Sequence, residues 1–221
     1  MDDSSIDAAG ALADPLRRRL YEFVVESGGE VGRAEAAQAL GIQRTLAAHH
    51  LDRLAEAGLL ETAHRRLNGR EGPGAGRPAK LYRRADRELS VHLPPRDYGL
   101  AARVLAEAVE RHGAEEALHA AAREEGRRIA RGSAAESLEG LLRERGYEPE
   151  EVPGGEPGES GLRLRNCPFH ALARDFPPLA CGLNLELLRG MLEAAGEDGG
   201  RARLDPAAGR CCVVISKNKK D

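Results

Sequence analysis

The residues of this chain best suited to chemistry are four cysteines, all in the last quarter of the sequence: Cys167, Cys181, Cys211 and Cys212. Cys167 belongs to the segment NCPFH, in which His170 follows with a Cys-x-x-His spacing that can place two ligands on one metal ion. Thiolate and imidazole ligands favour zinc or an iron–sulfur cluster over hard cations. The sequence therefore indicates a metal site near the C-terminal end of the chain.

The local sequence around the cysteines suggests how each would act. Cys181 directly precedes the helical pattern LNLELLRGML, so we expect it to open a helix whose dipole stabilises a thiolate. Cys211 and Cys212 lie in a segment, 210–216, that we expect to be a strand. Neighbouring side chains of a strand point to opposite faces, so normally only one of the pair joins the site. The predicted ligands are Cys167, His170, Cys181 and Cys211. The alternative is that the thiols are inert core residues, since free cysteines are often buried.

A second chemically distinctive group is cationic. Residues 63–87 contain eight Lys or Arg residues and two acids, which leaves a net charge of +6, whereas the whole chain has a net charge of −3. A basic patch on a chain that is otherwise slightly acidic favours a localised contact with a polyanion.

The elements that must position this patch are three helices and a hairpin. Asp14-Pro15 is a good helix start, Gly28 and Gly41 are helix stops, and apolar residues recur at helical spacing between them. We predict helices over residues 11–27, 33–40 and 43–57, a strand over 59–63, a Gly- and Pro-rich loop over 68–78, and a second strand over 79–84. This order is that of a winged helix-turn-helix.

In such a domain the third helix reads base edges in the major groove of double-stranded DNA. Ala47, Leu51 and Leu54 form its inner stripe. The outward residues expected to contact DNA are Gln43, Arg44, Thr45, Ala48 and His49. Gln pairs well with adenine and Arg with guanine. The hairpin residues expected to contact phosphates are Arg65, Arg66, Arg70, Arg77 and Lys80. Such contacts give affinity rather than sequence reading.

The rest of the chain continues the mainly α-helical class with a small β content. We predict helices over 98–112, 114–131 and 137–145, an acidic Pro/Gly loop over 148–161, a strand over 162–165, a helix within 178–195 and a strand over 210–216. The expected organisation is a winged helix-turn-helix DNA-binding domain over 1–88, central linker and dimerisation helices over 89–132, and a small α/β sensor module with the cysteines over 133–221. We expect a homodimer, because paired half-sites match a twofold protein. The apolar face of helix 98–112 is the natural dimer element, although it suits packing within the chain as well.

Three segments, ALADPLRRRLYEFV, QALGIQRTLAAHHLDRLAEAGLLE and GRPAKLYRR, resemble ArsR-like winged-helix repressors over residues 11–87. The second half resembles a branch of these regulators that includes the iron–sulfur-sensing repressor of the SUF cluster-assembly operon. The shared features are NCPF, a helix beginning Cys-x-x-Asn-x-x-Leu-Leu and a final Cys near the C-terminus.

The resemblance implies that Cys167, Cys181 and one of the Cys211 and Cys212 pair bind a cluster. Arg163 stands where that branch has a further Cys. His170 or the second Cys of the pair would therefore have to complete the usual four ligands.

These observations lead to one expected function and one alternative. We expect a DNA-binding transcriptional regulator, a repressor, that senses iron–sulfur or redox status, with zinc as the alternative cofactor. The alternative function is a winged-helix regulator that responds to a small organic ligand, with structural or zinc-binding cysteines. The sequence has no Gly-rich phosphate loop, CxxC or nucleophile elbow, so we expect no enzyme. It has neither an apolar run of the ~20 residues that span a membrane nor a signal-like N-terminus, so we expect no membrane partner and a cytoplasmic location.

Overall fold

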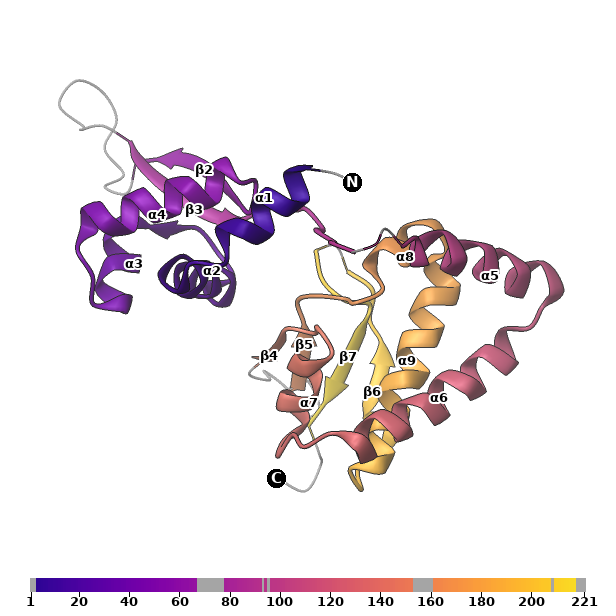
Figure 1. Ribbon diagram of the computed structural model, residues 1–221. Coiled ribbons are helices and arrows are strands. Elements are labelled where there is room, and N and C mark those ends of the chain that lie inside the picture. Colours follow the sequence, from indigo (N-terminus) through magenta and orange to yellow (C-terminus); the bar gives the residue numbers. More distant parts are fainter. Residues whose placement is uncertain are drawn as a thin grey trace. The chain divides into compact units, whose positions relative to one another are not determined.

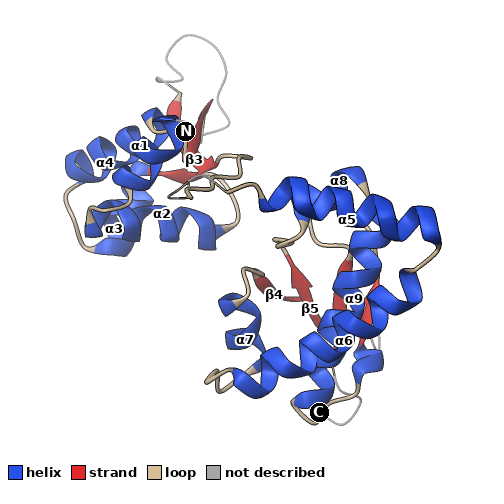
Figure 2. Cartoon of the chain, turned by 45° about the vertical axis from the view of Figure 1, so that its right-hand side comes forward, coloured by secondary structure: helices blue, strands red, loops and turns tan. Residues whose placement is uncertain are grey.

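The computed structural model describes residues 3–66, 78–92, 94, 96–152, 161–207 and 209–217. The chain divides into two compact units, Met1–Arg96 and Asp97–Asp221. Within the described residues each unit is mostly helical and contains a small sheet (Figures 1 and 2). The predicted class, mainly helical with some strand, is confirmed. None of the described helices is long and apolar enough to cross a membrane.

The first unit is a group of helices closed by a sheet. Its elements are α1 (Asp3–Ala11), α2 (Pro15–Ser27), β1 (Val31–Gly32), α3 (Arg33–Leu40), α4 (Arg44–Glu56), β2 (Leu60–Arg65) and β3 (Ala79–Arg84). The predicted bounds of α3 and β3 are confirmed, and those of α4 differ by one residue at each end. In the range 11–27 predicted as one helix, residue 11 ends α1 and α2 begins only at Pro15, because it is capped by Asp14. Its carboxylate accepts hydrogen bonds from the backbone N–H groups of Leu16 and Arg17, each at 2.9 Å.

The sheet of the first unit fixes the hairpin against the helices. The strand order is β1-β3-β2, and both pairings are antiparallel. The β2–β3 register runs from Leu60 opposite Arg84 to Arg65 opposite Ala79, so β2 extends two residues beyond its predicted end. The core holds Leu20, Val24, Leu51, Leu54 and Tyr82, each at most 1% exposed. Burial of these side chains from both helices and sheet makes the hairpin an integral part of the unit.

The second unit places helices against a four-stranded sheet. Its elements are α5 (Tyr98–His112), α6 (Glu115–Gly132), α7 (Leu138–Glu144), β4 (Pro149–Val152), β5 (Gly161–Leu164), α8 (His170–Asp175), α9 (Pro177–Ala194), the 3₁₀ turn η1 (Gly199–Arg201), β6 (Ala202–Leu204) and β7 (Val213–Ser216). The sheet order is β4-β5-β7-β6, with antiparallel neighbours. The helices expected over 98–112, 114–131 and 137–145 are confirmed within one residue at each end.

Three sequence predictions for this unit are wrong. Cys181 does not open its helix, because Pro177 and Pro178 start α9 one turn earlier, at positions where proline loses no helical hydrogen bond. Cys211 and Cys212 precede β7 rather than belonging to it, so the alternation of a strand does not separate their side chains. The predicted loop over 148–161 contains β4, because an edge strand tolerates a proline at its start and pairs with β5.

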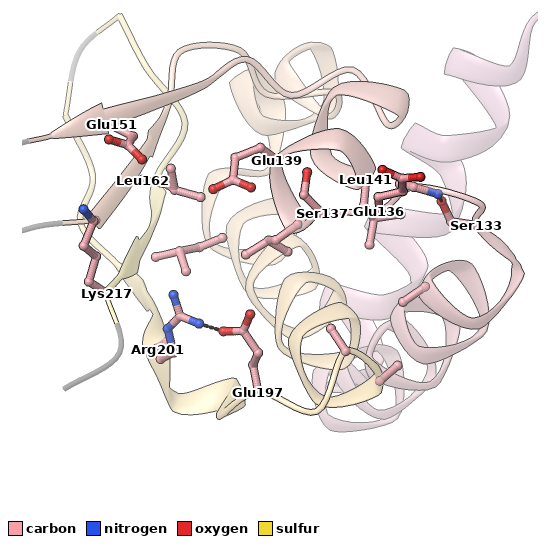
Figure 3. A pocket seen from close by; sticks show the side chains of 17 residues that line it. Ser133, Glu136, Ser137, Glu139, Leu141, Glu151, Leu162, Glu197, Arg201 and Lys217 are labelled. Carbon is pink, nitrogen blue, oxygen red and sulfur yellow. Dashed lines mark hydrogen bonds and ion pairs between the residues drawn. The ribbon is translucent and has the colours of Figure 1, made fainter. Parts of the chain in front are cut away.

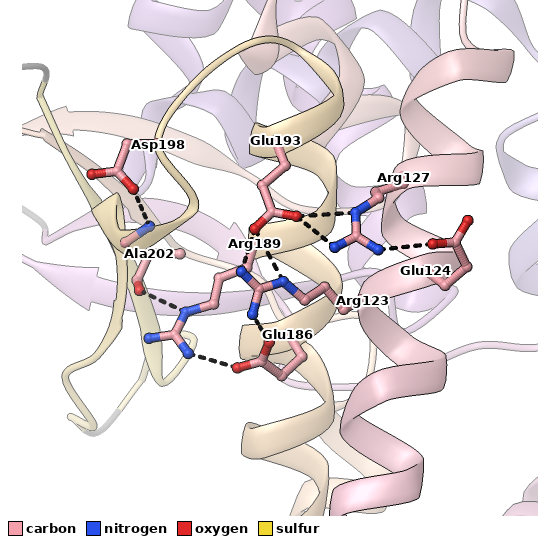
Figure 4. A network of polar contacts seen from close by, with 9 residues as sticks. Arg123, Glu124, Arg127, Glu186, Arg189, Glu193, Asp198 and Ala202 are labelled. Atoms are coloured by element: carbon pink, nitrogen blue, oxygen red, sulfur yellow. Dashed lines mark hydrogen bonds and ion pairs between the residues drawn. The ribbon is translucent and has the colours of Figure 1, made fainter.

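The close packing of α6 on α9 holds the second unit together. Gly126 and Gly190 lie where the two backbones approach each other. A Cβ on Gly126 would collide with the carbonyl oxygen of Leu187, and one on Gly190 with that of Arg123. Two arginines of α6 reach two glutamates of α9, as Figure 4 shows: Arg123 contacts Glu186 and Glu193, and Arg127 contacts Glu193. This packing fixes the helix that carries Cys181.

Candidate DNA interface and cysteine cluster

The helix predicted to read DNA, α4, turns the predicted side outward. Ala47, Leu51 and Leu54 are fully buried, which confirms the predicted inner stripe. Gln43 occupies the N-cap position, and its side chain is exposed, as are those of Arg44, Thr45 and His49. Ala48 is half-buried between them. These exposed polar groups at the start of one helix match what a major-groove reader must present.

His50, next to His49, points into the unit instead. It is 9% exposed, and its ring meets that of His49 edge-on at 5.3 Å between centroids. Burial lowers the pKa of His50, since the charged imidazolium loses hydration there, although the nearby Asp14 acts in the opposite direction. His50 is therefore a core residue of this unit and is absent from the outward face.

The hairpin carries the predicted phosphate contacts in different environments. Arg66 is exposed. Arg65 forms an ion pair with Glu30 at 3.0 Å, and Lys80 forms one with Asp52 at 2.6 Å. Arg70 and Arg77 lie outside the described residues. Two of the predicted phosphate ligands therefore already hold intramolecular partners.

Asp52 joins α4 to the hairpin, a role that the sequence did not reveal. Its Oδ1 accepts hydrogen bonds from Lys80 Nζ at 2.6 Å and from the Tyr82 hydroxyl at 2.8 Å. Partial burial acts to raise the pKa of Asp52, but the hydrogen bonds from Lys80 and Tyr82 outweigh it and leave the pKa lowered. Burial, followed by the Asp52 contact, raises the pKa of Tyr82, so its hydroxyl remains a donor. These contacts set the hairpin relative to the recognition helix.

Comparison with known families supports this assignment for the first unit. A family model described as a helix-turn-helix domain matches residues 12–63, which run from just before α2 into β2. Residues 12–63 thus form a helix-turn-helix domain, and this domain supports a DNA-binding transcription regulator. No curated protein matches the chain. No solved structure matches it.

In the second unit the four thiols form one connected group, which we call the cysteine cluster. Cys211 lies close enough to Cys167 and to Cys212 for their charges to interact, and Cys212 lies equally close to Cys181. These interactions link Cys167, Cys211, Cys212 and Cys181 in that order. The strand alternation that was expected to separate the adjacent pair does not apply, because Cys211 and Cys212 lie ahead of β7, and the choice of ligand between them stays a prediction.

One buried amide joins two members of this cluster. Asn184 of α9 is fully buried, and its Nδ2 donates to Cys211 Sγ at 3.1 Å and lies 3.9 Å from Cys167 Sγ. Its Oδ1 accepts a hydrogen bond from the hydroxyl of Tyr147, which is also buried. The sequence signal for this role is that Asn184 is the polar residue on the buried side of the run from Leu183 to Leu188. A buried polar residue requires a hydrogen-bond partner.

The cluster concentrates negative charge on one sulfur. Hydrogen bonds from Cys167 and Cys212, together with those from the Val213 backbone N–H and Asn184, lower the pKa of Cys211 despite its burial. The same contact with Cys211, reinforced by burial, raises the pKa of Cys167 and of Cys212. The hydrogen bonds that Asn184 Nδ2 and the Val213 N–H donate to Cys211 Sγ favour negative charge on that sulfur.

His170, the fourth predicted ligand, has a different setting. It is the first residue of α8, its side chain is exposed, and its backbone N–H donates to the carbonyl oxygen of Cys167 at 3.0 Å. Among the residues that the structure describes, no three His, Cys, Asp or Glu side chains converge tightly enough for one metal ion.

Two further features of the second unit bear on function. A cavity of about 590 Å³ lies beside α7 and the sheet (Figure 3). Apolar Leu141 and Leu162 and the charged Glu139, Arg201 and Lys217 are among its lining residues. Arg201 is already engaged there, by Glu197 and by the carbonyl oxygen of Ser216.

The other feature is the outer face of α5. Four large apolar side chains on it are between 51% and 66% exposed: Tyr98, Leu100, Val104 and Leu105. At helical spacing they lie on the side opposite the buried Ala106, with the small residues Ala101 and Ala108 between them. Large exposed apolar faces of this kind mark interaction surfaces.

Proposed function

We propose that this transcription regulator is a homodimeric repressor whose cysteine cluster binds an iron–sulfur cluster and reports its presence to the DNA-binding unit. The proposal is carried by one observation: four thiols from three separate segments of the second unit lie close enough for their charges to interact. The resemblance of the NCPF and Cys-x-x-Asn segments to iron–sulfur-sensing relatives points the same way.

The donor set suits this group. Iron–sulfur clusters are commonly held by four Cys thiolates, and hydrogen bonds to their sulfurs are part of such sites. In this proposal the fourth ligand is the Cys212 thiolate instead of the His170 imidazole. One zinc ion needs every ligand sulfur about 2.3 Å from one point, and no three ligand-type side chains among the described residues converge in that way. When bound, such a group supplies a centre that is sensitive to oxidants and to iron supply.

A route from the cysteine cluster to α5 exists within the second unit. α8 begins three residues after Cys167 and contacts both α9, which carries Cys181, and α5. A bound group ties Cys167 to Cys181, and thereby holds the start of α8 against α9. Its loss releases that tie and changes the support of α5. Coupling to DNA requires that these two states favour different arrangements of the dimer.

The partner of α5 in this proposal is a second copy of the chain. A twofold dimer presents two recognition helices to half-sites one helical turn apart, which a single helix-turn-helix cannot do. Leu105→Glu places a charge in the middle of the apolar face and is expected to give monomers in analytical ultracentrifugation. Arg103→Glu, which adds an acid on another side of α5, is expected to leave the dimer intact.

DNA reading is assigned to the exposed start of α4. Arg44→Ala is expected to relax the choice of one base pair, at a cost of about 1–3 kcal/mol on the preferred sequence and little on random DNA. Arg66→Ala is expected to weaken specific and random DNA alike and to reduce the salt slope by about one. Equal losses on both DNAs for the Arg44 variant would place the recognition helix in a different register.

The decisive experiment is iron, sulfide and zinc analysis of protein purified without air, with its visible spectrum. A brown protein with iron and sulfide is expected, and Cys212→Ser is expected to lose most of both, whereas His170→Ala retains them. Stoichiometric zinc in a colourless protein contradicts the iron–sulfur assignment in favour of zinc. If His170→Ala loses the iron while Cys212→Ser keeps it, the ligand set is the one that includes His170.

The cavity supports a second candidate function, a regulator that responds to a small organic ligand. Its volume of about 590 Å³ lies within the range of small-molecule sites, and it combines apolar walls with a few charged groups. Native mass spectrometry of the metal-free chain tests this candidate. One bound organic molecule of fixed mass, released together with a change in DNA affinity, favours it over the iron–sulfur proposal.

A further inference from the structure

The side-chain amide of Asn184 donates to two sulfurs of the cysteine cluster and accepts one hydrogen bond from Tyr147. It is fully buried in α9, among Leu187, Leu188 and Met191. Its nitrogen faces two sulfurs, at 3.1 Å and 3.9 Å, and its oxygen accepts from the Tyr147 hydroxyl. An amide can donate two hydrogen bonds, so the two sulfurs use both donors.

Tyr147 decides which end of the amide faces the sulfurs. It lies between α7 and β4 and is 2% exposed. Burial, with the nearby Cys211 next in importance, raises the pKa of Tyr147, so its hydroxyl keeps its proton. A protonated hydroxyl donates to the amide oxygen, which leaves the N–H groups for Cys211 and Cys167. The orientation is thus set from outside the cluster, by a residue about 20 positions before Cys167.

Packing alone does not account for this pair. Replacing both partners of a buried hydrogen bond by apolar groups of similar shape is often nearly neutral for stability. A Leu–Phe pair would therefore fill the same space in a core that is already rich in leucine. What an apolar pair lacks is an N–H group aimed at sulfur. Donors to sulfur are one of the means by which proteins adjust the electron density of thiolate-bound metal groups.

We propose that Asn184 is a positioning residue whose amide stabilises the negative charge on the Cys211 and Cys167 sulfurs of the metal-loaded cluster, with Tyr147 holding the amide in place. This inference rests on the proposed metal-binding function. It assigns a role to two residues that are not ligands, and it predicts that their removal changes the bound group without removing any sulfur.

The experiment compares the full-length chain with Asn184→Asp, Asn184→Leu and Tyr147→Phe. Asn184→Asp keeps the shape but replaces the donors by oxygen, and Tyr147→Phe removes a single hydroxyl. Ser137→Ala, which removes the N-cap hydrogen bond to Gly140 in the same unit, is the matched control. Each protein is reconstituted without air from ferrous iron and sulfide, and separately titrated with Co²⁺ as a probe of a zinc-type site. Circular dichroism of the metal-free proteins checks the fold.

Asn184→Asp is expected to weaken metal binding by about 10- to 100-fold, the usual effect of losing such a supporting contact, and Tyr147→Phe by less. The reduction potential of the reconstituted group is expected to become more negative in Asn184→Leu and Tyr147→Phe, since fewer N–H groups stabilise the reduced form. Should Asn184→Asp fail to fold, these two variants carry the test. Ser137→Ala is expected to match the parent in affinity and potential.

The outcomes separate this inference from the proposed function. If the parent chain takes up neither iron with sulfide nor Co²⁺, the metal-binding function falls and the role of Asn184 falls with it. If the parent loads but the three variants show its affinity, spectrum and potential, only the role of Asn184 is overturned. Reduced loading in proportion to lost folded protein, with an unchanged potential, also overturns it, because that result reflects structure alone.

Discussion

The two units of the chain hold their functional side chains in opposite ways. In the first unit, Gln43, Arg44 and His49 stand exposed on α4 and its N-cap, and the core beneath them is apolar except for His50. In the second unit, Cys211 and Asn184 are at most 1% exposed, and the Asn184 amide donates a hydrogen bond to the Cys211 sulfur. A surface that binds DNA must present its charged groups to solvent, whereas a thiolate site must keep solvent out.

The two sites differ in how strongly a change in core packing disturbs them. The outward face of α4 depends on one helix and its cap. The cysteine cluster depends on the relative position of several segments, because Cys167 precedes α8, Cys181 lies in α9 and the adjacent pair precedes β7. Small shifts between elements should therefore damage the second site more than the first.

The largest expected effect comes from Gly126→Ala. The new Cβ meets the backbone of α9, which cannot rotate away as a side chain can, so α6 and α9 must separate. Overpacking of a core costs about 1–3 kcal/mol, and we expect the upper end here. Metal loading of the cysteine cluster should fall with it, while hydrogen exchange in peptides of the first unit stays unchanged.

Gly132→Ala is the matched control for this prediction, because it lies on the same helix with nothing within 4 Å of the added Cβ. Alanine is the better helix former, so its stability should stay the same or rise slightly. Equal melting temperatures for the two variants would show that the helices tolerate separation, and would weaken the contrast between the two sites.

The same contrast explains what the sequence predicted and what it missed. The bounds of α3, α5 and β3 follow from local periodicity and glycine stops, which one segment specifies by itself. The joint placement of Cys211 and Cys212 did not follow, because it depends on where β7 begins relative to β5. The role of Asp52 did not follow either, because it accepts hydrogen bonds from a hairpin about 30 residues later.

A smaller effect is expected from Tyr82→Phe, which tests whether the exposed site also depends on long-range contacts. Loss of the hydroxyl leaves Asp52 with one partner fewer and should cost about 1 kcal/mol of first-unit stability. DNA affinity should fall because the hairpin is less well fixed to α4. Fluorescence anisotropy with a labelled duplex and chemical unfolding measure the two effects.

Glu61→Ala serves as the reference for that variant. It breaks the exposed pair with Arg83 on the same hairpin, in which both side chains are about half exposed. Surface pairs contribute little, so stability should change by less than about 0.5 kcal/mol. If the two variants behave alike, the Tyr82–Asp52 contact does not fix the hairpin, and α4 alone accounts for the site.

The smallest effect is a pH dependence confined to the first unit. Burial holds the pKa of His50 below its ordinary value of 6.5, so the folded unit keeps this imidazole neutral. As pH falls below 6.5, the unfolded chain binds a proton more readily than the folded one, and stability declines until the lower folded pKa is passed. Above 6.5 the contribution is fully present.

Acid titration between pH 6.5 and 5 isolates this group, since the ordinary pKa of Asp52 is 3.8 and its folded value is lower still. His50→Leu is expected to remove the decline in first-unit stability over this range, and His49→Gln, at the exposed neighbour, to preserve it. Hydrogen exchange in peptides of α4 measures the change, with peptides of α9 as the internal reference. A decline that persists in His50→Leu would trace it to another group and would leave His50 a neutral packing residue without influence on pH response.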